Sequence, residues 1–464
     1  MAERQTRKNG ALRDPLRSAM MAHIEGMPLL LLCTALCAAF CFATLNLCAQ
    51  MEGAVWIALA GTLGVALLML GIGKPVRGQP VIVLLCAALL AMVAVGAHLA
   101  MLDIRPARMS NVLQPMLDGM WNYELVTAMA WEENAWSGVY LIVMGLVSRL
   151  ERFPQMYALK LFDMICQCGA ALAILHLARM RGAKPLGALT AMFAGVLAPT
   201  MLFNAGCWAQ CDATFALFTL WGLALLLEDH PLAGCILWGV ALGTKLQSAF
   251  LFPLLIVWWM NGRVSLRHIL VLAAAFVACQ AAILLDGQGW TALLTRYAQQ
   301  LEIARNEAIL TDHAPGVYGL MVVASVREFS GMGLYLGIAS ALLVVAALLR
   351  ARRPLDVDGT LLAALLLAAG LPLILPQMNA RCLYLAGLLA FICANSPRRM
   401  LVAGMLEFIS FCSYMEAVFS KTVLPITVLS ILAIAVAALI AQELIALLTD
   451  RGGSKGALAH EGQA

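Results

Sequence analysis

One stretch decides the fold: Asn204 to Trp259, which reads NAGCWAQCDATFALFTLWGLALLLEDHPLAGCILWGVALGTKLQSAFLFPLLIVWW. Most of it is apolar, and its polar residues gather at three places. These are Trp208-Ala209-Gln210-Cys211-Asp212, Glu228-Asp229-His230 and Thr244-Lys245-Leu246-Gln247. Ionisable groups at the rims of membrane spans are costly to keep there, so each is a functional candidate. The intervals between the three groups suit apolar helices that fold back on one another, so we expect some of these side chains to meet.

The composition indicates the class of protein. The chain has 464 residues, of which 62% are hydrophobic and 12% charged, and its mean hydropathy is +0.88. A soluble domain of this size carries far more charge, so we predict an all-α, polytopic membrane protein. The formal net charge of +4 says little about partners, because its distribution over the loops matters more. We expect membrane lipids around the chain and no nucleic-acid partner, and the sequence leaves the oligomeric state open.

The cysteines do not predict a disulfide framework or a metal centre. Most of the 14 lie inside apolar stretches, where they serve as small packing residues. Cys207 and Cys211, one helical turn apart, are the only suggestive pair. No further His or Cys completes a zinc spacing around them, and the chain has no H-E-x-x-H or P-loop pattern. We therefore expect no metal and no cofactor.

The distribution of basic residues sets the topology. A basic tail at residues 1–26 precedes a first apolar run, Met27–Ala49, which is followed at once by further spans and is therefore not a cleaved signal. The remaining predicted spans are Ala54–Ile72, Gln79–Leu102, Met156–Leu177, Leu186–Phe203, Ala213–Leu226, Leu232–Gly243, Leu246–Trp259, Ile269–Leu285, Gly333–Leu349, Thr360–Leu375, Leu383–Ala394, Met400–Phe419 and Pro425–Leu448. Lys and Arg clusters fall in alternate loops, which the positive-inside rule assigns to the cytoplasm. We predict about 14 spans within residues 27–448 and a tail at 449–464. The chain is expected to cross the plasma membrane with both termini on the cytoplasmic side.

The same rule resolves the layout after His230. An apolar stretch of about 30 residues separates His230 from Arg263, long enough for one tilted span. A single span would place Arg263 and every later basic cluster outside. Two short helices that turn at Lys245 keep these clusters inside, and they place Lys245 on the outer side with Asp212. We therefore predict the hairpin.

Two large outer loops follow from this topology, residues 103–155 and 286–330. Each contains an amphipathic segment, Leu117–Trp131 in the first and Leu293–Ala308 in the second. Helices of this kind lie in the plane of the membrane interface. They either cap the bundle or form the walls of a site that faces the lipid.

The central stretch resembles a known family. W-x-Q-x-D at Trp208–Asp212, followed by H-P-L-A-G and K-x-Q ending at Gln247, is similar to the GT-C superfamily of membrane glycosyltransferases. The bacterial branch related to the second mannosyltransferase of GPI-anchor assembly is the most similar. The resemblance extends over most of the chain beyond Asp103. It implies a GT-C-like bundle and transfer of a mannose-like hexose from a polyprenyl-phosphate sugar to a lipid-linked or cell-envelope acceptor.

The outer loops carry further family motifs with departures. VLQPMLD at residues 112–118 resembles the family's F-L-x-P-W-x-D, but the family's preceding G-D-Y, whose Asp is the expected catalytic base, falls on Ala107-Arg108-Met109. LTDHAPGVY at residues 310–318 resembles L-T-x-N-A-P-N-x-Y. LPQMNARC at residues 375–382 stands where the family has L-P-K-M-H-E-R-Y, and of its His-Glu-Arg trio only Arg381 is present.

Residue roles follow from motif and position. Asp212 is a catalytic candidate, although Asp at the start of a helix is also a common N-cap. Asp103 and Asp118 are the carboxylates nearest the missing base, and Asp118 could equally belong to the polar face of an interfacial helix. The candidate substrate-binding residues are Trp208, Gln210, Lys245, Gln247, His313 and Arg381. Lys245 and Arg381 could hold the phosphate of a lipid-linked sugar, although Lys245 could also simply reach water.

Several polar residues have plainer interpretations. An outer-loop histidine such as His313 is often only solvated. His98 and His176, inside spans, are expected to be hydrogen-bonded packing residues, and Asp356-Val357-Asp358 a solvated cytoplasmic turn. Two other functions remain open: a non-catalytic GT-C protein that binds a lipid-linked glycan or a partner protein, favoured by the missing Asp, His and Glu, and a transporter. A transporter of the repeat type would show corresponding broken spans in two halves, and no such symmetry is visible.

Overall fold

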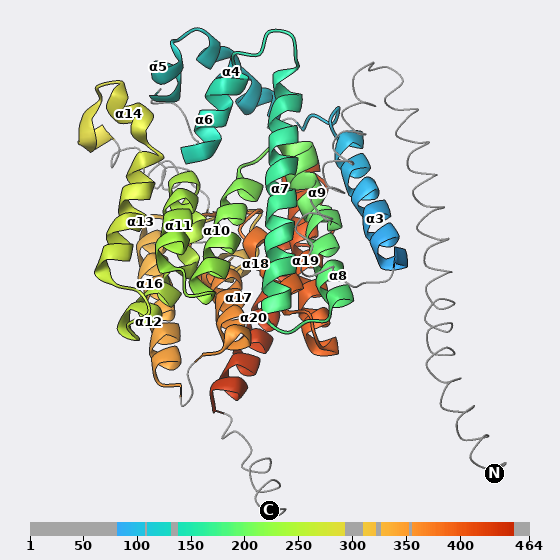
Figure 1. Cartoon of the computed structure of the whole chain (residues 1–464), viewed down its shortest axis with the longest axis vertical. Helices are drawn as coiled ribbons and strands as arrows, with labels where there is room; N and C mark the ends of the chain where they lie inside the picture. The colour runs from blue at the N-terminus through green and yellow to red at the C-terminus, as the bar shows by residue number, and fades with distance from the viewer. Residues whose placement is uncertain are drawn as a thin grey trace, which may run out of the picture.

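The computed structural model describes residues 81–106, 109–130, 138–292, 310–321, 326–351 and 355–449. Within them nearly all regular structure is helical (Figure 1). The α-helices are α3 (Val81–Ala100), α4 (Gln114–Trp121), α5 (Leu125–Ala130), α6 (Gly138–Val147), α7 (Gln155–Met180), α8 (Pro185–Leu197), α9 (Pro199–Leu202), α10 (Asp212–Leu227), α11 (Pro231–Thr244), α12 (Phe252–Met260), α13 (Leu266–Ala278), α14 (Ala281–Leu285), α16 (Val326–Leu349), α17 (Val357–Ile374), α18 (Tyr384–Cys393), α19 (Pro397–Phe419) and α20 (Ile426–Thr449). The strands β1 (Thr311–Asp312) and β2 (Met378–Asn379) form a two-stranded parallel sheet.

The all-α membrane class is confirmed. Five helices of the described residues are long and apolar enough to cross a membrane: α7, α16 over Gly331–Leu349, α17, α19 and α20. A sixth span results if Pro185–Leu197 and Pro199–Trp208, bent by 48° at their junction, are taken together. Several predicted spans correspond to shorter apolar helices, among them α10, α11, α13 and α18. The predicted spans Met27–Ala49 and Ala54–Ile72 lie outside the described residues.

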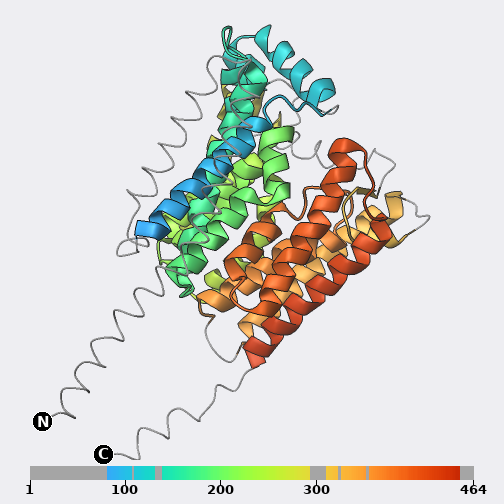
Figure 2. The ribbon, with the colours of Figure 1, turned by 90° about the vertical axis from the view of Figure 1, so that its right-hand side faces the viewer.

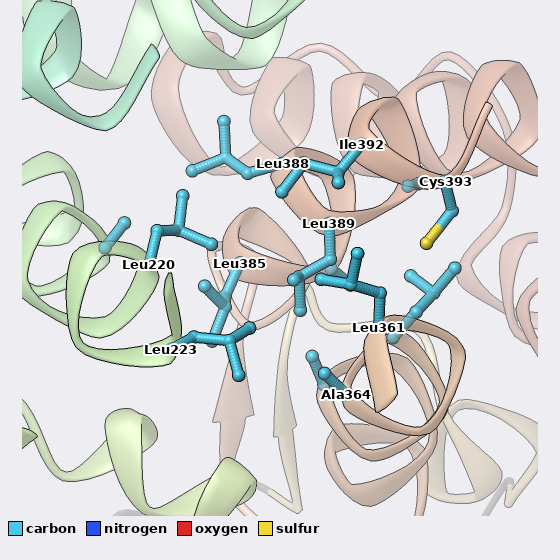
Figure 3. Packing of buried hydrophobic residues seen from close by; sticks show 14 of the residues in the cluster. Leu220, Leu223, Leu361, Ala364, Leu385, Leu388, Leu389, Ile392 and Cys393 are labelled. Atoms are coloured by element: carbon cyan, nitrogen blue, oxygen red, sulfur yellow. The ribbon is translucent and has the colours of Figure 1, made fainter. Parts of the chain in front are cut away.

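Helices from both halves of the chain share one core. Leu220 and Leu223 of α10 lie beside Leu385 of α18, and Leu389 of α18 lies beside Leu361 of α17 (Figure 3). Figure 2 shows α16–α20 packed along the helices that precede α12. Within lipid, apolar burial brings little hydrophobic gain, so close packing decides which helices associate.

Helices α10 and α11 pack closely against each other. A Cβ atom on Gly222 would lie 2.3 Å from Cδ1 of Trp238, and one on Gly234 would lie 3.0 Å from the carbonyl oxygen of Gly222. Small residues at such positions let two helix backbones approach closely. Gly222 and Gly234 therefore allow α10 and α11 to pack closely, and Asp212 is the first residue of α10.

A proline bends the span that leads to Trp208. Pro199 has no N–H for the carbonyl of Gly195, four residues earlier. The Gln167 amide of α7 replaces it, donating to the carbonyl of Val196 at 3.1 Å and more weakly to that of Gly195 at 3.4 Å. Its Oε1 lies 2.8 Å from Nε2 of His98, which is buried. His98 is therefore a hydrogen-bonded packing residue, as predicted.

The second half of the bent span is capped from another helix. The Glu407 carboxylate of α19 accepts from the backbone N–H of Thr200 at 2.9 Å and from its hydroxyl at 2.7 Å. Helix N-termini leave N–H groups without partners, and a carboxylate satisfies them favourably. The chain then runs through a π-helical turn, Phe203–Trp208, into α10.

The predicted hairpin at Lys245 is present. Lys245 is extended, with φ −155° and ψ 129°, and it separates α11 from the 3-10 helix Leu246–Leu251 that precedes α12. Arg263, just beyond α12, pairs with Asp229, just before α11, at 2.6 Å. Both ends of the stretch therefore lie together, and the chain turns back at Lys245.

The two large loops meet at one end of the bundle, where α4, α5, α6 and α14 lie (Figure 1). Thr127 donates to Asp286 at 2.8 Å, and Gln288 donates to the carbonyl of Ala130 at 2.9 Å. The expected single helix Leu117–Trp131 is wrong in detail, because the chain breaks between α4 and α5 and leaves Trp121 42% exposed. The apolar helix α6 was not predicted, and Leu293–Ala308 lies outside the described residues.

Candidate functional site

The site is built around the carboxylate of Asp212, the first residue of α10, which has no exposed surface. Its Oδ1 accepts a hydrogen bond from the Lys245 ammonium group. Its Oδ2 accepts from Nη1 of Arg381 at 3.2 Å and from Nδ2 of Asn204 at 2.9 Å. The predicted N-cap role is not observed, because Cys211 occupies that position and the Asp212 side chain binds the two cations instead. Three segments far apart in the sequence thus converge on one anion.

The turn before α10 presents Trp208 and Gln210 to Arg381. Ala209 adopts a left-handed conformation, with φ +50°, which reverses the chain there. Gln210 Oε1 accepts from Nη1 of Arg381, and the guanidinium carbon lies 5.0 Å from the ring centre of Trp208. Cation–π contact and hydrogen bonding together fix the plane of the guanidinium.

Lys245 lies at the break between α11 and the following 3-10 helix. Its Nζ atom lies 5.2 Å from the ring centre of Phe215, one turn into α10. The side chains of Lys245 and Arg381 are each 14% exposed. Two cations around one carboxylate leave a net charge of +1, and their remaining donors can bind a further anion as charge-assisted hydrogen bonds.

The two loop motifs are joined by the small sheet. Thr311 and Asp312 pair in parallel with Met378 and Asn379, and the N–H of Gln377 donates to the carbonyl of Leu310 at 2.8 Å. Beyond β2, Asn379 Oδ1 accepts from the backbone N–H of Arg381 at 3.1 Å. The L-T-D-H-A-P segment therefore positions the loop from which Arg381 reaches Asp212.

Two predicted substrate-binding residues, His313 and Gln247, form no hydrogen bond or ion pair with Asp212, Lys245 or Arg381 among the described residues. His313 is in the left-handed region, with φ +57°, and is 41% exposed. Its Nδ1 lies 3.6 Å from Oε1 of Glu416, and its Nε2 lies 3.7 Å from Oδ1 of Asp312. Gln247 is half-buried in the 3-10 helix after Lys245 and makes no hydrogen bond to the described residues of the cluster.

Asp103 and Asp118 are exposed carboxylates in the first loop. Asp103 accepts from the hydroxyl of Tyr157, and Asp118 accepts from Nε2 of Gln114 at 2.8 Å. Neither bonds to a described residue of the Asp212 cluster. Both are therefore open to solvent and to a ligand at the loop end of the bundle.

The D-x-D pattern is not a free turn, so that prediction is wrong. Asp356 accepts from the N–H of Gly359 at 2.7 Å and caps α17. Asp358 binds Arg399 through both carboxylate oxygens, at 2.6 Å and 2.8 Å. Both lie at the end of α17 opposite β2, so they brace the bundle away from the site.

The remaining sequence candidates are structural. His176 bonds to Glu228 at 2.8 Å, which confirms it as a hydrogen-bonded residue. Cys207 and Cys211 are both buried and free. Within the described ranges no group of three or more His, Cys, Asp or Glu side chains could hold a metal.

Sequence reasoning missed Asn204 and Tyr414. Asn204 donates to Asp212 and lies 2.9 Å from the Tyr414 hydroxyl, and the Tyr414 ring meets Trp208 edge-on at 5.6 Å. Both are polar side chains at the end of a predicted span or within one, which is the signal that could have identified them.

The cluster also has unused bonding capacity. Nε of Arg381, Nε1 of Trp208 and Oδ1 of Asn204 are buried and have no hydrogen-bond partner in the described part of the chain. Buried polar groups normally have partners, so this position suits water or an oxygen-rich ligand.

The comparisons with known proteins do not identify the chain. No protein-family model matches it, and no curated protein matches it.

Proposed function

We propose that the protein is a GT-C-type glycosyltransferase that moves a mannose-like hexose from a polyprenyl-phosphate sugar to a lipid-linked or cell-envelope acceptor. The observation that carries this proposal is the convergence of Lys245 and Arg381 on the buried Asp212 carboxylate. The three residues belong to the motifs on which the family resemblance rests. Together they form a cationic site beside both large loops, because Tyr140 of α6 donates to the carbonyl of Ala209 at 2.7 Å and β1 pairs with β2 next to Arg381.

The phosphate of the donor occupies the face of Lys245 and Arg381 that Asp212 leaves open. A departing polyprenyl phosphate gains negative charge during transfer, and preorganised cations in a water-poor site stabilise that charge strongly. Asp212 has no exposed surface and is bonded on both oxygens, so it orients the cations and does not act as a base.

We assign the general base of the transfer reaction to the first loop. Asp103 and Asp118 are exposed at the same end, and either can deprotonate or orient the acceptor hydroxyl. General-base catalysis typically contributes about 10²- to 10⁴-fold. Trp208 and Gln210 hold Arg381, and we assign Gln247 and His313 to contacts with the substrate outside the Asp212 cluster.

The proposal includes a topology. The domain comprises about 14 spans in a plasma membrane, with α4, α5, α6 and α14 on the outer face and both termini in the cytoplasm. The hairpin at Lys245 supports this arrangement, because it keeps Lys245 at the same end as Asp212.

A second function, binding of a lipid-linked glycan or a partner protein without catalysis, is favoured by one observation. The Asp212 cluster contains no carboxylate besides Asp212 among its described bonded residues. Such a protein would bind the polyprenyl phosphate and leave its sugar in place.

Transfer of labelled sugar from a polyprenyl-phosphate donor by the purified protein separates the two functions. We expect transfer by the wild type, and its loss in Asp103→Asn or Asp118→Asn with donor affinity retained, because such a change acts on the transition state. Donor binding without transfer by the wild type would replace the enzyme by the binding protein. Absence of both would refute the proposal.

A further inference from the structure

Asp163 is a buried carboxyl group that the proposed function does not use. It lies in the middle of α7 and has no exposed surface. Its Oδ1 has no hydrogen-bond partner within the ranges that the structure describes, and its Oδ2 lies 3.4 Å from the hydroxyl of Tyr140. Among the described residues it forms no ion pair. A carboxylate in this position would lack both the cation and the strong donors that buried charges require.

Among the described residues, the surroundings of Asp163 offer no neutralising charge. The titratable groups near enough to interact with Asp163 are Tyr140 of α6, Asp212 of α10, Tyr384 of α18, Cys211 before α10 and Cys166 on α7 itself. None of these is a cation. Lys160, one turn earlier on α7, directs its ammonium group to the carbonyl oxygens of Met101, Leu102 and Ile104, at 3.0, 2.8 and 2.6 Å.

The single hydroxyl proton of Tyr140 determines which group donates in the contacts of Tyr140 with Ala209 and Asp163. A tyrosine hydroxyl has a single proton to donate. Tyr140 donates it to the carbonyl of Ala209 at 2.7 Å, which leaves only oxygen lone pairs facing Asp163. Two oxygens without a proton between them repel each other. The contact between Tyr140 and Asp163 is therefore favourable only when the Asp163 carboxyl supplies the proton.

We propose that Asp163 is a proton-binding site, held as a neutral acid whose hydroxyl donates to the Tyr140 oxygen. The resulting chain runs from Asp163 through Tyr140 to the carbonyl of Ala209. It connects α6, one of the helices of the first loop, to the left-handed turn that precedes Asp212. Because the proton neutralises Asp163, Asp212 is the only one of these two neighbouring carboxyl groups that carries a negative charge, and it is the one bonded to Lys245 and Arg381. This inference goes beyond glycosyl transfer and does not depend on it.

Infrared spectroscopy of the purified protein tests the protonation directly. Asp163→Asn is a matched variant, because its amide can donate to the Tyr140 oxygen without a proton to lose. We expect the difference between wild type and variant at neutral pH to show the loss of one carbonyl stretch of a protonated carboxylic acid. The loss of carboxylate stretches in its place would overturn the proposal. Asp103→Asn, at an exposed carboxyl group, is the control and should lose carboxylate stretches.

Tyr140→Phe provides a second measurement that leaves Asp163 intact. Without the tyrosine oxygen, the acid loses its acceptor, so its carbonyl stretch should move to higher frequency. An unchanged protonated-acid band in this variant would show that Asp163 does not donate to Tyr140, and would overturn the proposal. This variant also decides the question if Asp163→Asn fails to fold.

Discussion

Replacing Asp212 by Asn should be the most damaging single change at the site. The amide keeps the shape of the carboxyl group and removes its charge. Lys245 and Arg381, each 14% exposed, would then face each other in a buried position without their shared anion. Removing one partner of a buried ion pair typically costs about 3–5 kcal/mol, because the remaining charge is uncompensated. The 2.9 Å hydrogen bond from Asn204 would also lose its charged acceptor.

The free energy of unfolding in mild detergent, followed with a denaturant, measures this loss. We expect Asp212→Asn to lower it by about 3–5 kcal/mol, as argued from the buried pair. Adding Lys245→Met should recover part of the loss, with a coupling energy of about 1–3 kcal/mol in the double-mutant cycle. Asp118→Asn, at an exposed carboxyl group with one side-chain partner, is the control and should stay within about 0.5 kcal/mol. Equal stabilities of Asp212→Asn and the control, with no coupling to Lys245, would refute the ion cluster.

Three other predictions concern the framework. Gly138→Ala should destabilise the protein by about 1–3 kcal/mol, because Gly138 has φ +61° and its new Cβ would lie 2.4 Å from the Gly243 carbonyl oxygen. Thermal unfolding measures this loss. Gly187→Ala, with open space around its Cβ, is the control and should be neutral or stabilising, and equal melting temperatures of the two variants would contradict the close packing at Gly138. Gln167→Leu should cost about 1–3 kcal/mol, since it leaves the carbonyls at the Pro199 bend unsatisfied, and unchanged unfolding would show that the bend needs no donor. Reporter fusions after residues 184, 267, 353 and 399 should all report cytoplasm, and an outside signal at 267 would contradict the proposed orientation of the hairpin.

The sequence predicted most helices because apolar runs and their polar ends define spans almost directly. The hairpin at Lys245 was found from the basic residues beyond it, and the Arg263–Asp229 pair bears it out. Helix α6 was missed since its apolar run is only 10 residues long and lies within a predicted loop. The split between α4 and α5 was missed too, because amphipathic spacing does not reveal where a helix ends.

The site was predicted only in part, because its convergence depends on tertiary contacts. Motifs identified Asp212, Lys245 and Arg381 separately, and the topology placed the first two at one end. That Lys245 and Arg381 share the Asp212 carboxylate depends on the β1–β2 pairing. This pairing joins segments 67 residues apart, Thr311 to Met378, and it is too short to leave a periodic signal. Asn204 and Tyr414 entered the network through tertiary packing alone.

Binding of a polyprenyl-phosphate sugar to the purified protein tests the central claim most directly. Lys245→Ala and Arg381→Ala should each weaken binding by about 1.5–3 kcal/mol, the range for hydrogen bonds to charged groups, while Lys245→Arg keeps part of the affinity. Arg267→Ala, an exposed cation beyond the hairpin, is the control and should bind as the wild type does. Equal affinity of both alanine variants and the wild type, with folding intact, would contradict the assignment of the phosphate to this cluster.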